Sequence, residues 1–279
     1  MAKLRDRLWL WGHPEGRYNN EFGNNKASRM TPMECCAYMG IDRTFMVPVQ
    51  VNVDRRQYNK SFKPLKEVGW ECYDAGKDPS VVDPLIKEAG DFKNITRVVF
   101  DDFHRYGSFV NMPVENLWKV HEKLHNNPVK SLDMWMVLYT HEFGEIINDY
   151  PEFNERFKPY IEPFDGVIMW TWCEDKGVPV IPKKWEEFKA ITPKQRRMFG
   201  CYLWNFGDEK QATGQAVEWQ LDFYLDKIKK GEAEGIVLHT NTMADLDYEA
   251  YDVALEWLEK HYDDEVPRSE EHTSELQSR

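Results

Sequence analysis

The stretch Arg97–Phe103, RVVFDDF, decides the fold. Its apolar residues 98–100 show no polar alternation, which is typical of a strand covered on both faces. The run ends at two adjacent carboxylates, Asp101 and Asp102. Because burying one ionised carboxylate is costly and burying two neighbours costs more, the end of this strand is expected to reach a solvated rim.

The same pattern, an apolar run followed by an amphipathic segment, occurs eight times. The runs are Leu8–Gly12, Thr44–Val49, Trp70–Tyr73, Arg97–Phe100, Met134–Tyr139, Gly166–Trp170, Met198–Trp204 and Gly235–His239. Helices are expected from Thr31 and over Phe62–Val68, Ser80–Ala89, Pro113–His125, Glu145–Phe157, Lys184–Ala190, Thr213–Lys230 and Tyr248–His261. Eight such units predict an α/β protein with a single (β/α)₈ TIM barrel. No GxGxxG motif follows an early run, so an open dinucleotide-binding sheet has no support.

Two of these helices carry start or stop signals. Thr31, Pro32 and Glu34 form a capping box with proline at the first helical position. Gly231 follows the segment Thr213–Lys230 and is expected to end that helix.

Residues 1–267 are interpreted as one catalytic barrel domain. The segment Arg268–Arg279, RSEEHTSELQSR, resembles a translated sequencing-library adapter and is expected to be a non-native tail. Residues 1–7 are basic, but the apolar LWLWG beyond them is too short for a signal peptide. A cytoplasmic location is therefore expected, while a domain after Pro267 and a longer natural start are left open.

The composition excludes several classes of partner. The formal net charge of −12 argues against binding to nucleic acid or to an anionic membrane surface. No apolar run approaches the ~18 residues of a membrane span. The five cysteines form no CxxC pair, so buried, reduced thiols are expected.

Polar and aromatic residues gather where the predicted strands end. Active sites of such barrels lie at the carboxyl ends of the strands, so these residues are expected to share one rim. The candidate catalytic residues are Asp101, Asp102 and Glu142. The candidate substrate-binding residues are His13, Glu15, Asp74, Tyr139, His141, Trp170, Trp172, Trp204, Asn205, Asp208, His239 and Asn241.

The adjacent aspartates have a functional and a structural interpretation. Two neighbouring carboxylates repel each other, so the pair is expected to divide into a proton donor and a charged partner. The alternative is a helix cap or a loop ion pair with Arg105. The position at a barrel rim favours the functional interpretation. His121, on the apolar face of its helix, is expected to be a hydrogen-bonded core histidine.

Four rim segments together resemble the barrel of O-GlcNAcase-type (family 84) glycoside hydrolases. They are VVFDDF at 98–103, LYTHEF at 138–143, IMWTWC at 168–173 and LWNFGD at 203–208. The resemblance implies substrate-assisted chemistry, in which the 2-acetamido group of the sugar attacks the anomeric carbon. It implies that Asp101 polarises that group, that Asp102 is the general acid/base, and that Asn205 and Asp208 hold sugar hydroxyls.

The sequence departs from that family at three places that shape the sugar pocket. Trp172-Cys173 replaces a Gly-Pro pair, Asn205 and Asp208 are closer in sequence, and GHPEGRYN follows the first run. The resemblance therefore points to a relative of the family and leaves the sugar and the linkage open.

The sequence thus predicts a glycosidase that cleaves a β-linked sugar, with Trp170, Trp172 and Trp204 stacking on sugar faces. If the substrate lacks an acetamido group, Glu142 is the expected second catalytic carboxylate. One alternative is a metal-dependent hydrolase or isomerase with ligands His13, Asp101, His141 and His239, although no HxH or HExxH spacing supports a metal. The other alternative is a carbohydrate-binding barrel without catalysis. No cofactor is expected, and oligomeric state is left open.

Overall fold

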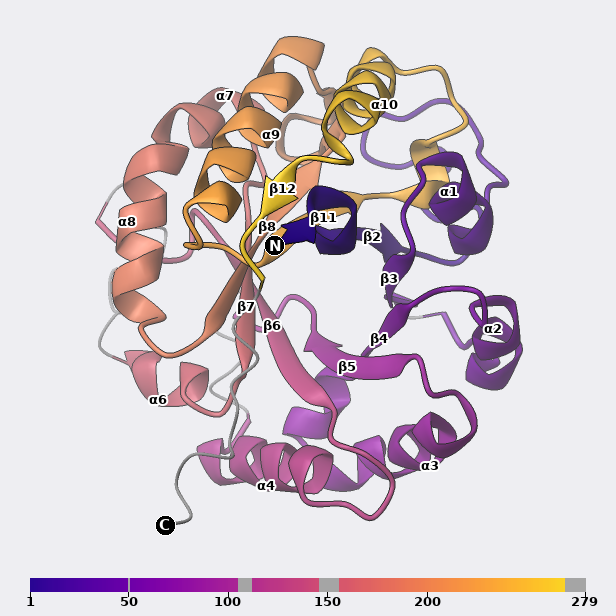
Figure 1. Ribbon diagram of the computed structural model, residues 1–279, viewed down its shortest axis with the longest axis vertical. Coiled ribbons are helices and arrows are strands. Elements are labelled where there is room, and N and C mark those ends of the chain that lie inside the picture. The colour runs from indigo at the N-terminus through magenta and orange to yellow at the C-terminus, as the bar shows by residue number, and fades with distance from the viewer. Residues whose placement is uncertain (50, 105–111, 146–155, 269–279) are drawn as a thin grey trace.

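Eight parallel strands form a closed barrel in the computed structural model, which describes residues 1–49, 51–104, 112–145 and 156–268. The strands are β2 (Leu8–Gly12), β3 (Arg43–Met46), β4 (Glu67–Glu71), β5 (Ile95–Phe100), β6 (Asp133–Tyr139), β7 (Gly166–Trp170), β8 (Arg196–Tyr202) and β11 (Gly235–His239). The last strand, β11, pairs with both β2 and β8 and so closes the barrel (Figure 1). The predicted (β/α)₈ barrel is confirmed.

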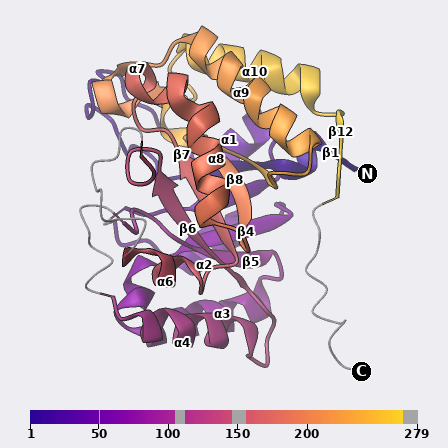
Figure 2. The same ribbon diagram turned by 90° about the vertical axis from the view of Figure 1, so that its left-hand side faces the viewer.

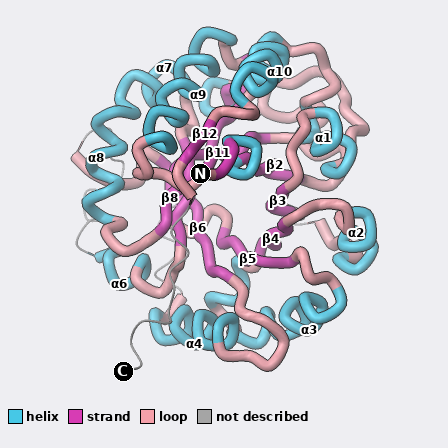
Figure 3. The backbone as a smooth tube through the Cα atoms, in the orientation of Figure 1, coloured by secondary structure: helices cyan, strands magenta, loops and turns pink. Residues whose placement is uncertain are grey.

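Helices surround this barrel on its outside (Figure 3). They are α1 (Pro32–Tyr38), α2 (Arg55–Ser61), α3 (Asp83–Asp91), α4 (Val114–His125), α6 (Lys158–Ile161), α7 (Glu174–Gly177), α8 (Ile181–Ile191), α9 (Gly214–Lys229) and α10 (Glu249–His261). Outside the barrel, β1 (Ala2–Lys3) pairs with β12 (Glu265–Val266), and β9 (Trp204–Asn205) pairs with β10 (Lys210–Gln211). Figure 2 shows β1 and β12 side by side, on the side of the molecule that holds the amino terminus.

The apolar runs are continuous because both faces of each strand are buried. In β2, Leu8 and Leu10 belong to the layer between strands and helices, whereas Trp9 and Trp11 belong to a second cluster inside the barrel. Strand β6 alternates in the same way, with Trp135, Val137 and Tyr139 inside the barrel. This two-sided burial is the physical reason that the period-2 pattern of a half-exposed sheet is missing.

Inside the barrel, three large aromatic rings each lie over a glycine of the next strand. The register pairs Phe45 with Gly69, Trp135 with Gly166, and Trp170 with Gly200. A Cβ atom at each glycine would come within 2.4, 2.5 and 2.0 Å, respectively, of the ring beside it. The glycines therefore provide the space in which these rings pack.

Replacing Gly200 with alanine is expected to lower the free energy of unfolding by about 1–3 kcal/mol, because the new methyl group would overlap the Trp170 ring in a packed interior. Urea unfolding of both proteins measures the difference. Gly90→Ala in α3 is the matched control, since its Cβ would meet Val129 at an ordinary 3.4 Å. Alanine at that helical site should be neutral or stabilising. Equal stability of Gly200→Ala and the wild type would contradict this account of the barrel interior.

The helix of the second unit and the strand of the third unit differ from the prediction. The helix expected over Phe62–Val68 is wrong, because α2 covers Arg55–Ser61 and the chain then passes Pro64 into β4. The Asp54 side chain starts α2 by accepting a hydrogen bond of 3.0 Å from the backbone N–H of Gln57. This helix is almost entirely polar, so it has no apolar period from which it could be predicted. Strand β4 begins at Glu67, three residues before the predicted Trp70.

The predicted helix start at Thr31 and the predicted helix stop at Gly231 are confirmed. The Thr31 hydroxyl accepts a hydrogen bond of 3.3 Å from the backbone N–H of Glu34, whose carboxylate accepts one of 2.8 Å from the backbone N–H of Thr31. The Thr213 hydroxyl caps α9 by accepting a hydrogen bond from the backbone N–H of Ala216, and Gly231, just beyond the end of α9, has a φ of +73°.

The helix predicted over Glu145–Phe157 lies almost entirely outside the described residues, as does the tail after Arg268. Within the part of the chain that is described, no helix has the length and apolar character needed to cross a membrane.

Candidate active site

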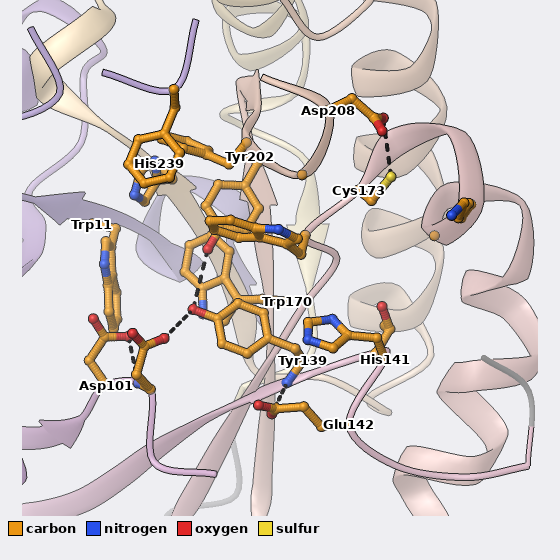
Figure 4. A pocket seen from close by; sticks show the side chains of 18 of the residues that line it. Trp11, Asp101, Tyr139, His141, Glu142, Trp170, Cys173, Tyr202, Asp208 and His239 are labelled. Carbon is orange, nitrogen blue, oxygen red and sulfur yellow. Dashed lines mark hydrogen bonds between the residues drawn. The ribbon is translucent and has the colours of Figure 1, made fainter. Parts of the chain in front are cut away.

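A cavity of about 510 Å³ opens at the carboxyl ends of the barrel strands (Figure 4). Its lining combines carboxylates, aromatic rings and two cationic side chains. The lining residues are Trp11, Arg17, Tyr18, Phe22, Val49, Asp101, Asp102, Tyr139, Thr140, His141, Glu142, Trp170, Trp172, Cys173, Lys176, Gly177, Val180, Tyr202, Phe206, Gly207, Asp208 and His239. Nine of the fifteen residues proposed from the sequence are therefore brought together here.

Asp101 and Asp102 follow directly after β5, and both line the cavity. The Asp101 Oδ1 atom accepts a hydrogen bond of 2.9 Å from the backbone N–H of Asp102. Asp102 has a φ of +48°, in the left-handed region that Asp tolerates better than most residues. Successive residues of a regular strand point to opposite faces. This turn instead lets two neighbouring carboxylates reach the same cavity.

Two tyrosines extend from the aspartate pair. Tyr139, at the end of β6, donates a hydrogen bond of 2.9 Å to Asp102 Oδ1, and the Tyr202 hydroxyl lies 3.5 Å from that of Tyr139. Burial raises the pKa of both phenols well above the usual value, and the nearby carboxylates raise it further. Both phenols therefore stay protonated at neutral pH. They act as neutral hydrogen-bond donors that fix the position of the Asp102 carboxyl group.

Glu142 is a third carboxylate that lines the cavity, three residues after the end of β6. Its Oε2 atom accepts a hydrogen bond of 2.9 Å from the backbone N–H of Tyr139, and its Oε1 atom lies 3.5 Å from Nδ1 of His104. The side chain is only 2% exposed. These contacts hold the carboxylate against the strand end, in the same cavity as the aspartate pair.

Aromatic rings form one wall of the cavity. The Trp11 and Trp170 ring centroids lie 5.4 Å apart, and those of Trp170 and Tyr202 lie 4.7 Å apart. Trp172 stacks on Phe206 at 5.6 Å, and its ring is only partly buried. Such rings offer flat apolar faces beside polar groups, a combination that suits a ligand with both apolar and hydroxyl surfaces.

His239 lines the cavity, and His13 lies behind it. The His13 Nδ1 atom lies 2.7 Å from the Val47 carbonyl oxygen, and since a carbonyl only accepts, this nitrogen carries the proton. The Nε2 atoms of the two histidines lie 3.2 Å apart, so His239 Nε2 donates to His13. His239 Nδ1 is then an acceptor, and it has no hydrogen-bond partner among the described residues. Asn241 fixes His13 by bonding to both its backbone N–H and its carbonyl group, at 2.8 and 3.0 Å.

The two buried histidines predict a loss of stability in mild acid. Burial lowers the pKa of His13 to about 3 and the pKa of His239 well below its usual value. Below a pH of about 6.5, the unfolded chain therefore binds protons that the folded protein does not bind, so stability falls as the pH falls. Between pH 6.5 and 5, His13 should account for a loss of about 1.6 kcal/mol, and His239 should add to that loss.

Urea unfolding at several pH values in this window measures the effect. His239→Gln should show a shallower fall in stability than the wild type, because it lacks one of the two titrating groups. Parallel curves for the two proteins would refute the assignment of this pH dependence to the buried pair.

Five more predicted residues lie outside the cavity lining, in addition to His13. Glu15 accepts a hydrogen bond from the Tyr58 hydroxyl, and Asp74 is 74% exposed and paired with Lys77. Trp204 is buried, its indole N–H donates to the carbonyl oxygen of Phe22, and its ring packs against Tyr248. The remaining two are Asn205 and Asn241, which are buried and hydrogen-bonded to protein groups.

Asp208 lines the cavity and is held from two sides. The Asn205 amide donates a hydrogen bond of 2.8 Å to its Oδ2 atom, and the Cys173 thiol donates one of 3.1 Å to the same atom. Asn205 therefore positions Asp208 from behind the cavity wall.

The expectation of buried, reduced thiols is confirmed for four of the five cysteines, whereas Cys173 is free but only partly buried.

Sequence reasoning missed several lining residues. Trp11 and Tyr202 point into the barrel, and the inward alternation of β2 and β8 predicts this once the strands are placed. Arg17, Tyr18 and Phe22 come from the loop between β2 and α1. That loop has no apolar period, so no sequence signal linked it to the rim.

The four proposed metal ligands do not form one cluster. His13 and His239 bond to each other, and His141 stacks on the Tyr139 ring with centroids 5.4 Å apart. Among the described residues, the one group of three side chains with suitably close ligand atoms lies elsewhere.

No protein-family model and no curated protein matches this sequence. Among solved structures, the chain is similar to a putative alpha-L-fucosidase from Bacteroides thetaiotaomicron, with a TM-score of 0.60 and 11% identity over 94% of this chain and 95% of that one. It is also similar to the PgaB (BpsB) glycoside hydrolase domain from Bordetella bronchiseptica, with a TM-score of 0.46 and 8% identity over 93% and 99% of the two chains. Plasmodium falciparum HPPK-DHPS also matches, with a TM-score of 0.42 and 9% identity over 92% of this chain and 49% of that one. At these identities the similarity establishes the barrel fold alone, and the resemblance to family 84 stays a prediction.

Proposed function

We propose that this protein is a glycoside hydrolase whose catalytic carboxylates are Asp101 and Asp102. One observation carries the proposal: the two adjacent carboxylates enter an aromatic-walled cavity at the carboxyl end of a barrel. Carboxylate pairs flanking a glycosidic bond are the usual machinery of glycoside hydrolysis. The likeness to a putative alpha-L-fucosidase agrees with this proposal at the level of the fold.

In the proposed reaction, Asp102 transfers the protons. The protonated Asp102 carboxyl group gives its proton to the glycosidic oxygen as the bond to the anomeric carbon breaks. In the second step, a water oxygen bonds to the anomeric carbon while the bond that replaced the glycosidic bond breaks, and the Asp102 carboxylate takes the proton from that water. The hydrogen bond from Tyr139 holds the Asp102 carboxyl group in one orientation during both steps.

The positive charge that develops at the anomeric carbon needs a second carboxylate. For a 2-acetamido sugar, Asp101 would polarise the acetamido group, whose oxygen attacks the anomeric carbon. For a sugar without that group, Glu142 is the carboxylate within the same cavity that would form or stabilise the intermediate. The sugar would lie against the partly buried Trp172 ring, with Asp208 accepting hydrogen bonds from its hydroxyls.

Hydrolysis of a panel of nitrophenyl glycosides tests the proposal. The panel contains β-glycosides with and without a 2-acetamido group and an α-L-fucoside, each assayed with and without EDTA. We expect turnover of at least one sugar, with no effect of EDTA. Turnover restricted to acetamido sugars would support the substrate-assisted route, and turnover of the other sugars would support Glu142.

Two outcomes would reject the proposal. Activity that EDTA abolishes and a divalent metal restores would support a metal-dependent hydrolase. Binding of sugars in calorimetry without any turnover would support a non-catalytic carbohydrate-binding barrel.

A further inference from the structure

A second cluster of polar side chains lies outside the cavity, where α4 ends and β7 begins. His121 and His125 stand one turn apart near the end of α4, and Asp165 immediately precedes β7. One ligand atom from each of these residues lies within 4.8 Å of the other two. Because β7 starts at the amino end of the barrel, this cluster lies at the end opposite the cavity.

The geometry of the three side chains suits a small cation. His125 Nε2 lies 2.9 Å from Asp165 Oδ2, and the His121 and His125 ring centroids lie 4.3 Å apart. A tetrahedral ion with bonds of about 2.1 Å holds its ligand atoms roughly 3.4 Å apart. That spacing falls within the limit of 4.8 Å that the three ligand atoms already satisfy.

Neighbouring groups orient two of the three ligands. The Ser131 hydroxyl lies 2.8 Å from Nδ1 of His125, which leaves Nε2 of the ring facing Asp165. The backbone N–H of Met134 donates a hydrogen bond of 2.7 Å to Asp165 Oδ2. Metal-binding histidines and carboxylates are commonly fixed by outer hydrogen bonds of this kind.

His121 supplies the observation that a simple ion pair does not explain. It was expected to be a hydrogen-bonded core histidine, but its ring is only about half-buried. Its Nδ1 atom is inaccessible to solvent and has no hydrogen-bond partner among the described residues. Leaving a buried polar atom unpaired is costly. A cation bound to Nδ1 would give this nitrogen a partner.

We propose that His121, His125 and Asp165 bind one Zn²⁺ ion, with water in the fourth position. Two imidazoles and one carboxylate are ligands that zinc accepts, whereas calcium and magnesium prefer oxygen ligands throughout. The ion would replace the proton that His125 and Asp165 share. It would join the end of α4 to the start of β7 and so stabilise the barrel independently of the proposed glycosidase site.

Zinc titration of the full chain tests this site. All samples carry Cys173→Ser, which removes the one partly exposed thiol among the five cysteines. After treatment with EDTA and dialysis, isothermal titration calorimetry with zinc chloride should show one ion bound per chain. Zinc should also raise the melting temperature, because it binds the folded state. His121→Ala should weaken zinc binding by at least about tenfold.

His261→Ala is the matched control. His261 Nδ1 lies 2.8 Å from Asp264 Oδ2, so this pair also joins an imidazole to a carboxylate, but without a second imidazole. Zinc affinity should not change in this variant. If circular dichroism shows that His121→Ala is unfolded, His121→Gln and His125→Gln replace it. Absence of zinc binding, or equal affinity in the reference protein and a folded His121 variant, would overturn the proposal.

Discussion

Asp102→Asn is expected to lower kcat by about 10²–10⁴-fold on any glycoside that the wild type cleaves, because the amide cannot transfer a proton to the leaving oxygen. The change is nearly isosteric, and the amide oxygen can still accept the hydrogen bond that Tyr139 donates. The melting temperature should therefore stay close to that of the wild type. Initial rates on nitrophenyl glycosides and a thermal scan measure the two quantities.

The dependence on the leaving group tests the role of Asp102. A general acid matters most when the leaving group is basic, so Asp102→Asn should lose more activity on an alkyl glycoside than on a nitrophenyl glycoside. If Asp102 instead served only as a charged stabiliser, the loss would be similar for both. Asp74→Asn is the matched control, since Asp74 is exposed and outside the cavity. Retention of full activity by Asp102→Asn would remove the aspartate pair from the mechanism.

Arg97→Met is expected to lower the free energy of unfolding by about 3–5 kcal/mol, because it removes the nearest cation from the buried carboxylate of Glu234. Arg97 is 6% exposed, and its guanidinium lies 2.8 Å from Glu234 and 3.6 Å from Glu67. The same guanidinium lies between the Trp9 and Trp135 rings, at 4.3 and 4.8 Å from their centroids. Methionine keeps much of this packing, so the expected loss reflects the charge.

Urea unfolding of the single and double variants separates charge from packing. The double variant Arg97→Met/Glu234→Gln should lose less free energy of unfolding than the two single variants lose when their losses are added. The reason is that the double variant removes both members of the shortest ion pair and leaves neither charge unpaired there. Arg56→Met is the surface control, since its ion pair with Asp91 is more than half exposed on both sides and should matter little. Strictly additive losses would show that Arg97 stabilises the barrel through packing alone.

The charged side chains at the two ends of the barrel therefore have different roles. At the amino end, arginines and carboxylates neutralise each other. Burial alone would raise the pKa of Glu67, but Arg97 and Arg43 beside it hold that pKa below the usual value. At the carboxyl end, the carboxylates of Asp101 and Asp102 face a cavity large enough for a ligand. In barrels of this class, the amino end serves stability and the carboxyl end serves chemistry.

Most of the barrel was predictable because its strands are buried on both faces. The bounds of β2, β7 and β11 agree with the prediction, since each is a continuous apolar run between polar segments. The helix of the second unit and the strand of the third unit were misplaced because they lack this pattern. Strand β4 contains Gly69 and ends in charged residues, and α2 is polar, so neither shows the pattern on which the prediction depended.

The candidate site was predictable only in part. The carboxyl ends of parallel strands must meet at one rim, which is why Asp101, Tyr139, Glu142 and Trp170 share the cavity. Beyond the ends of the strands, where the alternation stops, the sequence does not indicate which rim residues turn inward. His13 lies behind His239, and Asn205 lies behind Asp208, because each forms hydrogen bonds with protein groups instead of facing the cavity.

The sequence by itself determined the barrel and the end at which its polar groups gather. The reason is that the local pattern of apolar residues predicts both the order of the strands and their burial on two faces. Only the tertiary structure decided how the interior is filled and which side chains meet. The pairing of Trp170 with Gly200, the left-handed turn at Asp102 and the cluster of His121, His125 and Asp165 all join groups through the register of neighbouring strands, a local backbone turn or contacts between distant segments. Such contacts depend on the positions of atoms in three dimensions, which no local pattern records.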